Sequence, residues 1–161
     1  MTPAFKTQIT TAIACLVIAG VFSGAALATA PLSGAAAIQA RQAGFKVQGG
    51  AFKAIADQLK APTPDVGAIR TAANTVNSQA GVIGTWFPAG SGPEAGVPTR
   101  AKPEIWTDSA HFAEALNAFR TQAPRLKAAA DSGNLDNIRA EFMATGRTCG
   151  GCHQAFRAAE H

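Results

Sequence analysis

Hydrophobic residues recur along this chain at alternating spacings of three and four, the period of amphipathic helices. The first such stretch covers residues 33–59, and the Ala61-Pro62-Thr63-Pro64 segment ends it because proline cannot continue the helical hydrogen-bond ladder. The second stretch begins near Asp65, a suitable N-cap residue, and continues to Ile83. The predicted inward-facing positions of these two helices are Ile38, Gln42, Phe45, Gly49, Phe52, Ala56, Leu59, Val66, Ile69, Ala73, Val76, Ala80 and Ile83.

A loop rich in proline and glycine over residues 87–103 separates these helices from two more. Thr107 or Asp108 is expected to cap the third helix, in which Pro124 predicts a kink or a break with a restart. After a turn at 132–134, the fourth helix carries inward-facing positions at Leu135, Ile138, Phe142, Thr145, Cys149, Cys152 and Phe156. Four helices of similar length without any strand pattern predict an all-α fold, an antiparallel four-helix bundle.

The first 28 residues have the pattern of a secretory signal peptide. They hold one charged residue, Lys6, an apolar run, and a small-residue cleavage pattern that ends at Ala28. We expect cleavage after Ala28, which leaves one domain over residues 29–161 and places the protein in the periplasm. An uncleaved membrane anchor is the alternative, because the apolar run is nearly long enough to span a bilayer.

The segment Cys149-Gly150-Gly151-Cys152-His153 is typical of a covalent attachment site for c-type haem. The two thiols can form thioethers with haem, and His153 can ligate the iron through a ring nitrogen. Positions 149, 152 and 153 share one side of a helix. We therefore expect one haem c per chain. A thioredoxin-type redox pair and a structural zinc site are weaker alternatives, since the first requires a βαβ context and the second requires more ligands.

The glycines around this motif weaken the fourth helix, each by roughly 1 kcal/mol relative to alanine. We expect Gly146, Gly150 and Gly151 to make room for the flat macrocycle, with a frayed helix end as the alternative. The third cysteine, Cys15, lies in the signal peptide. The chain has a formal net charge of +4 but no basic patch with interleaved aromatic residues, so we expect no nucleic-acid partner.

From about Ala35 to its end, the sequence resembles cytochrome c′, a class of c-type cytochromes with the haem motif near the C-terminus of a four-helix bundle. The resemblance rests on the haem motif with Arg157 one turn later, and on three further segments: Arg41-Gln42, the run from Trp86 to Gly92, and the run from Lys102 to Trp106. It implies that Arg41 and Gln42 contact the haem propionate side and that Thr99 or Arg100 touches the haem edge. Arg157, four residues after His153, either lies over the imidazole or faces solvent.

The sixth position of the iron decides the function. The resemblance implies that low-spin electron carriers with this bundle use a methionine four residues after the arginine, where this chain has Phe45. Met143 is on the same helix as His153 and cannot reach the other face of the haem, which leaves His111 and His161 as possible ligands. We therefore predict a five-coordinate, high-spin iron with Phe45 as a distal lid.

Such a site admits NO and CO, whereas bound O2 acquires negative charge that an apolar lid does not stabilise. We expect a haem protein that acts in electron transfer with a redox partner protein, in binding of these gases, or in both. A low-spin electron carrier with an unidentified sixth ligand is the alternative. We expect no enzymatic activity, because Phe45 offers neither half of an acid–base pair. The resemblance also implies a homodimer formed through the first two helices.

Overall fold

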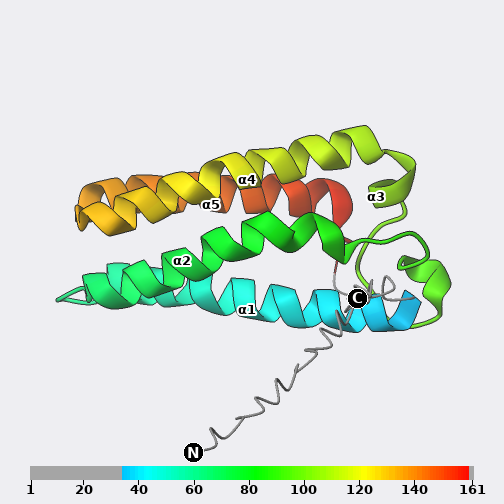
Figure 1. Cartoon of the computed structure of the whole chain (residues 1–161), viewed down its shortest axis with the longest axis horizontal. Coiled ribbons are helices and arrows are strands. Elements are labelled where there is room, and N and C mark those ends of the chain that lie inside the picture. Colours follow the sequence, from blue (N-terminus) through cyan, green and yellow to red (C-terminus); the bar gives the residue numbers. More distant parts are fainter. Residues whose placement is uncertain (1–33, 160–161) are drawn as a thin grey trace, which may run out of the picture. The chain divides into compact units, whose positions relative to one another are not determined.

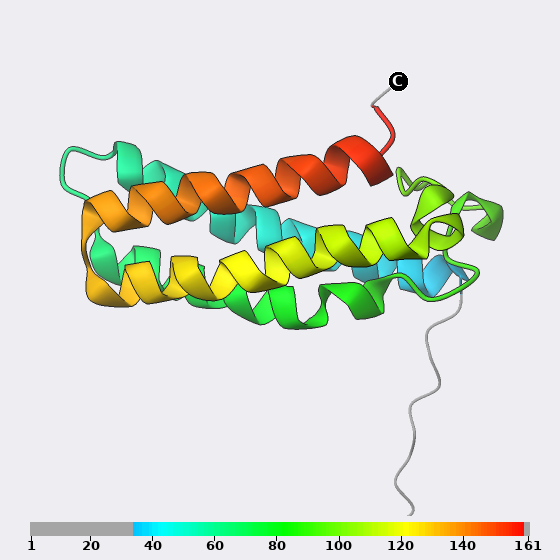
Figure 2. The same cartoon turned by 90° about the horizontal axis from the view of Figure 1, so that it is seen from above.

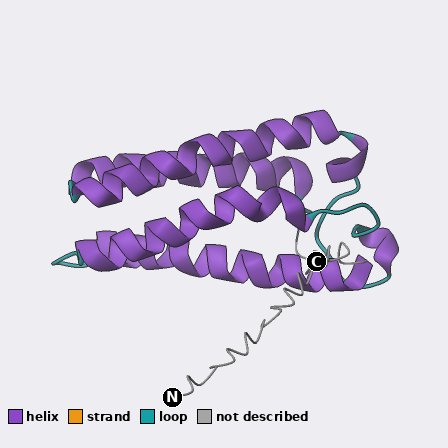
Figure 3. Ribbon diagram, in the orientation of Figure 1, coloured by secondary structure: helices purple, strands orange, loops and turns teal. Residues whose placement is uncertain are grey.

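A computed structural model describes residues 34–159 of the chain, and within this range it is helical with no strand. The long helices are α1 (Gly34–Lys60), α2 (Val66–Val82), α4 (Ser109–Ser132) and α5 (Leu135–Phe156). Figures 1 and 3 show them lying side by side as a bundle, and Figure 2 shows the same helices from above. The predicted all-α four-helix bundle is confirmed. The predicted signal peptide and its cleavage site lie outside the described residues.

Local sequence signals set most of the helix ends. The Asp65 carboxylate accepts a hydrogen bond from the Ala68 amide, and Asn134 caps α5 by accepting from the amides of Asp136 and Asn137. Gly133 ends α4 in the left-handed region, at φ +73°, which favours glycine. Asp108, one of the two predicted caps, accepts from the amide of His111. These caps explain why the predicted ends agree closely with the structure.

Of the kink or break predicted at Pro124, the break does not occur, because α4 runs without interruption from Ser109 to Ser132. Proline removes one backbone hydrogen bond within a helix, a cost of about 3 kcal/mol. The flanking residues Ala123 and Leu126 are completely buried. Burial of this apolar face keeps the helix continuous through the proline, so tertiary packing outweighs the local penalty.

The loop between α2 and α4 contains short helices that the hydrophobic pattern did not predict. These are η1 (Ile83–Trp86), η2 (Pro93–Ala95) and the single turn α3 (Glu104–Thr107). Trp106 lies in α3, and its indole N–H donates to the carbonyl oxygens of Phe87 and Pro88. The loop is therefore folded against the bundle end.

The core is made by one face of each long helix. Its fully buried aliphatic side chains are Ile38, Ile55, Ile69, Val76, Leu126 and Ile138. Helices α1 and α2, α2 and α4, and α4 and α5 pack against each other extensively, whereas α1 and α5 make few contacts. No helix among the described residues combines the length and apolar character needed to cross a membrane.

Candidate functional site

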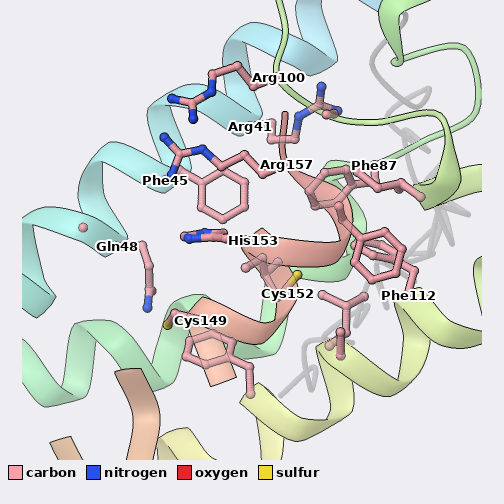
Figure 4. Close-up of a pocket in the computed structure, with 18 of the residues that line it drawn as sticks. Arg41, Phe45, Gln48, Phe87, Arg100, Phe112, Cys149, Cys152, His153 and Arg157 are labelled. Carbon is pink, nitrogen blue, oxygen red and sulfur yellow. The ribbon is translucent and has the colours of Figure 1, made fainter. Parts of the chain in front are cut away.

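A cavity of about 570 Å³ opens between α1 and α5, the two long helices that make few direct contacts. This volume lies within the range of roughly 300–1,000 Å³ typical of cofactor sites. Its lining is mostly apolar and includes Phe45 and Phe52 from α1 and Phe112 and Phe119 from α4. Figure 4 shows the cavity with its labelled side chains.

The motif residues Cys149, Cys152 and His153 all line this cavity from α5. Their spacing of three and four residues puts them on one side of the helix, as predicted. Both cysteines are free thiols, and burial raises the pKa of each. For Cys152, the neighbouring Cys149 adds to this effect. Both thiols thus lie at the cavity wall about one helical turn apart, where they could attach a ligand covalently.

His153 lies at the last turn of α5, and its pKa is lowered by burial first, then by the positive charges of Arg157 and Arg100. A lowered pKa keeps the imidazole neutral at neutral pH, which is the form that ligates iron. The spacing of Arg157 left open whether it lies over the imidazole of His153 or faces solvent, and no spacing signal in the sequence connects Arg100 with His153.

A backbone latch, formed by residues 100–102 and 156–158, holds Arg100 close to His153. The Lys102 amide donates to the Phe156 carbonyl, and the Ala158 amide donates to the Arg100 carbonyl, at 3.0 and 2.8 Å. The Arg100 Nε also donates to the Ala158 carbonyl. The latch therefore ties the loop before α3 to the chain immediately after the haem motif.

Arg41 is 3% exposed and organises the loop that closes one end of the cavity. Its Nη1 donates to the Trp86 carbonyl and the Ser91 hydroxyl, and its Nη2 donates to the Ser91 carbonyl and the Thr99 hydroxyl. Burial lowers the pKa of Arg41, and the nearby charge of Glu94 opposes this shift. Because these bonds engage the four hydrogens of both terminal nitrogens, only the Nε–H is left for a haem propionate.

The other predicted contact residues lie around the same cavity. Gln42, Thr99, Arg100 and Arg157 all line it, and the Gln42 amide donates to the Pro98 carbonyl. The lining includes basic side chains, with Lys46 among them, but no Asp or Glu. This positive lining suits the propionate carboxylates of haem. The roles predicted for the individual residues toward haem stay predictions.

Phe45 is held within a chain of aromatic contacts. Its ring meets Trp86 edge to face at a centroid distance of 5.1 Å and Phe87 at 6.2 Å. Phe87 in turn packs against Phe112, and Phe112 packs against Phe156. Figure 4 shows Phe45 extending from α1 into the cavity that His153 enters from α5. The predicted lid residue is thus in the same cavity as the predicted iron ligand.

Met143 and His111, the other described residues considered as iron ligands, do not line this cavity. Met143 is 59% exposed, and His111 has a side chain 58% exposed that pairs with Asp108; neither lines the cavity. His161 lies outside the described residues. Across residues 34–159, no group of three or more His, Cys, Asp or Glu side chains could hold a metal ion. The described residues therefore do not provide the ligand set that a structural zinc site requires.

Two features of the site were not predicted correctly. Gly150 and Gly151 are exposed and do not line the cavity, so the expectation that they make room for the macrocycle is wrong for both. Gln48 was not singled out, yet it lines the cavity at 7% exposure, and its amide nitrogen and oxygen have no hydrogen-bond partner. Its position beside Gly49 in the apolar stripe of α1 was the available signal.

The residues present fit a covalently attached haem. The thiols and imidazole share one wall, the volume suits a cofactor, basic groups line the cavity, and a buried amide lacks a partner. When bound, such a group supplies an iron that can change oxidation state and bind small ligands. Fold and site together define a class of protein: a c-type cytochrome built on a four-helix bundle.

Comparison with known proteins identifies the family within this class of c-type cytochromes. Residues 36–157 match the sequence model of the family described as Cytochrome C′. Cytochrome c′ from Alcaligenes xylosoxydans is 44% identical over 72 residues, which cover 45% of this chain and 54% of that relative. The chain spans about half the length of this relative and of cytochrome c′ from Rubrivivax gelatinosus.

Solved structures of cytochrome c′ are similar to this chain over a larger share of its length than the sequence relatives above. Cytochrome c′ from Thermochromatium tepidum has a TM-score of 0.76 and 30% identity, covering 81% of this chain and 100% of that one. A ferrous arginine-to-lysine variant from Alcaligenes xylosoxidans with bound NO has a TM-score of 0.70 and 28% identity, with coverage of 78% and 95%. A cytochrome c′ described as showing ligand-controlled dimer dissociation has a TM-score of 0.74 and 27% identity, with coverage of 81% and 100%.

The chain therefore belongs to the cytochrome c′ family, as the sequence resemblance indicated. Members of this family carry covalently attached haem c, and the haem motif of this chain, Cys149 to His153, lies within the matched residues. Membership of this family confirms the predicted cofactor, covalently attached haem c.

Proposed function

We propose that the protein is a periplasmic haem protein whose iron is five-coordinate and high-spin, and which binds NO or CO on the side opposite His153. The observation that carries this proposal is Phe45, which stands in the cavity at the position where a methionine ligand would be required. Its ring has no donor atom, and its aromatic contacts keep it in place. Among the described cavity-lining residues, His153 is the only histidine and there is no methionine.

The related cytochrome c′ with bound NO supports the choice of ligand. Neutral diatomic molecules can enter an apolar cavity without a large desolvation cost, and NO and CO bind ferrous haem without a strong hydrogen-bond donor. We propose no enzymatic activity, because Phe45 supplies no acid–base group at the open side.

Electron transfer to a redox partner protein is compatible with the same site, since a haem iron can cycle between two oxidation states. The low-spin alternative requires a sixth ligand from the protein. Lys46 is the described cavity-lining residue with a free amine side chain, so it is the candidate for that alternative. Complete reduction and reoxidation by a co-expressed partner, without NO affinity, would favour the electron-carrier interpretation.

The predicted signal peptide and the haem motif both support a periplasmic location. We propose that residues 1–28 direct export and are removed after Ala28, so that the mature domain of residues 29–161 receives its haem in the periplasm. N-terminal sequencing of the purified protein would begin at Thr29. An intact Met1 would contradict the proposed cleavage. We further propose a homodimer, in line with the related protein whose dimer dissociation is ligand-controlled.

The test is spectroscopic. The ferric protein is expected to show high-spin iron in its absorption and EPR spectra, and the absorption spectrum of the ferrous protein is expected to change when CO binds. Phe45→Met is expected to give low-spin iron and suppress CO binding, because it introduces a thioether donor into the cavity. Phe142→Met is the matched control, since Phe142 packs on Phe52 but does not line the cavity. Purely low-spin ferric iron in the unmodified protein would overturn the proposal.

A further inference from the structure

Gln48 is the one buried side chain in the described residues whose amide atoms both lack a hydrogen-bond partner. It is 7% exposed, so water does not satisfy these atoms in place of protein groups. Burying an amide without hydrogen bonds is unfavourable, and native proteins rarely leave such a group unpaired unless a ligand or an ordered water completes it. A leucine at this position would avoid the penalty.

The position of Gln48 indicates what completes the amide. It lies one turn after Phe45 and one turn before Phe52 on α1, and all three side chains line the cavity. Gly49 lines the cavity as well, and a Cβ atom there would meet nothing within 4 Å. Phe45 and Phe52 offer no polar atom, and Gly49 adds no side chain. The Gln48 amide is consequently buried in an apolar part of the cavity wall, and its neighbours on α1 offer it no polar group.

This wall faces the residues that attach the cofactor. Cys149, Cys152 and His153 all extend from α5, whereas Phe45 and Gln48 extend from α1 (Figure 4). Cys149, Cys152 and His153 would hold a macrocycle from α5, and Phe45 and Gln48 are then the residues of α1 available to its open side. In the view of Figure 4, the Gln48 side chain extends from α1 toward the segment of α5 that carries Cys149.

We propose that the Gln48 amide Nε2–H donates a hydrogen bond to a diatomic ligand bound at the open side of the iron. This inference rests on the proposed five-coordinate site and adds a residue that selects among its ligands. A diatomic bound to ferrous haem carries partial negative charge on its outer atom, and an amide donor in an apolar cavity stabilises that charge. The side of the cavity opposite His153 thus contains one polar group, the Gln48 amide, in addition to the apolar Phe45 ring that the sequence predicted there.

Carbon monoxide is the probe, and Gln48→Leu removes the donor while keeping the site buried. The infrared C–O stretching frequency of the ferrous-CO complex is expected to rise, because loss of a donor reduces back-donation into the ligand. The CO dissociation rate constant is expected to increase by roughly two- to twelvefold, the range that corresponds to one net hydrogen bond. In the unmodified protein, the band is expected to shift in D2O, since the amide protons exchange.

Two further variants separate hydrogen bonding from steric effects. Gln48→Met keeps the length of the side chain without the donor, so it should raise the stretching frequency as Gln48→Leu does. Gln39→Leu is the matched control, because Gln39 is exposed on the same helix and does not line the cavity. It should leave both the frequency and the dissociation rate unchanged.

The outcomes are distinguishable. An unchanged C–O frequency and rate in both Gln48 variants, with CO bound as in the unmodified protein, would overturn the role of Gln48 and leave the open site standing. Failure of the unmodified ferrous protein to bind CO would overturn the open site, and the role of Gln48 with it. A frequency that rises in Gln48→Leu but not in Gln48→Met would show a steric effect and contradict the hydrogen bond.

Discussion

Two arginines from separate parts of the chain, Arg157 and Arg100, lower the pKa of His153 through their positive charges. Arg157 follows it by one helical turn, and the backbone latch brings Arg100 from the loop before α3. Both charges oppose protonation of the imidazole and add to the effect of burial on its pKa. The neutral imidazole is the form that binds iron, so these arginines would protect the proposed histidine–iron bond against acid.

Arg157→Gln should therefore make the axial bond more sensitive to acid. Removing this charge raises the pKa of His153, so the imidazole competes for a proton at higher pH and the histidine–iron bond is lost at higher pH than in the unmodified protein. An acid titration followed by the absorption spectrum measures the midpoint. Arg147→Gln is the control, because Arg147 is exposed on α5 and is not among the charges that shift His153. Equal midpoints for the two variants would contradict this role of Arg157.

The roles of some site residues could be predicted from the sequence, whereas the partners of others could not. Cys149, Cys152 and His153 were predictable because a short spacing encodes the chemistry of one helical turn. The partners of Arg41 were not, because they lie 45 to 58 residues away in a loop without periodicity. Gln48 was missed for a different reason. Helical periodicity predicts which positions face inward, but it does not show whether a polar inward residue finds a partner.

At the scale of elements, the contact between α1 and η1 holds the aromatic lid. Gly44 packs so closely on the Trp86 indole that a Cβ atom there would lie 2.6 Å from the ring. Trp86 in turn packs edge to face on Phe45. The glycine thus permits the approach of the indole that positions the lid, and its place in mid-helix follows from this packing rather than from helix propensity.

Gly44→Ala is expected to lower the free energy of unfolding by about 1–3 kcal/mol, as overpacking of a filled site typically does. Gly50→Ala is the control on the same helix, because a Cβ atom at Gly50 meets nothing within 4 Å. There the better helix propensity of alanine should raise stability by up to about 1 kcal/mol. Denaturant unfolding of the two proteins gives both values. A stabilising Gly44→Ala would show that Trp86 moves aside at little cost.

The long helices were predictable because each has a sustained apolar face and recognisable caps such as Asp65 and Asn134. The connection between α2 and α4 was not, since its short helices η1, η2 and α3 depend on contacts with Arg41 and Trp106 that periodicity does not encode. Pro124 illustrates the opposite error. A local rule predicted a kink or a break, and the buried residues on either side of the proline keep the helix unbroken.

At the scale of the whole molecule, the first two helices expose apolar side chains that the bundle does not bury. Val47 on α1 is 50% exposed and Val82 on α2 is 46% exposed. Val47 lies three residues after Gly44 and Val82 four residues before Trp86, so both valines are close in sequence to the contact between Gly44 and Trp86. Single exposed valines are common, but two near one interhelical contact suit the proposed homodimer.

The double variant Val47→Glu, Val82→Glu is expected to be monomeric at concentrations where the unmodified protein sediments as a dimer. A two-fold interface brings the same patch of both subunits together, so each substitution places like charges opposite each other and buries them without partners. Sedimentation velocity gives the oligomeric state, and the haem spectrum checks that the bundle is intact. Met143→Glu is the control, because Met143 is 59% exposed but lies on α5. A dimer that survives the double substitution but dissociates in Met143→Glu would place the interface on α5 instead.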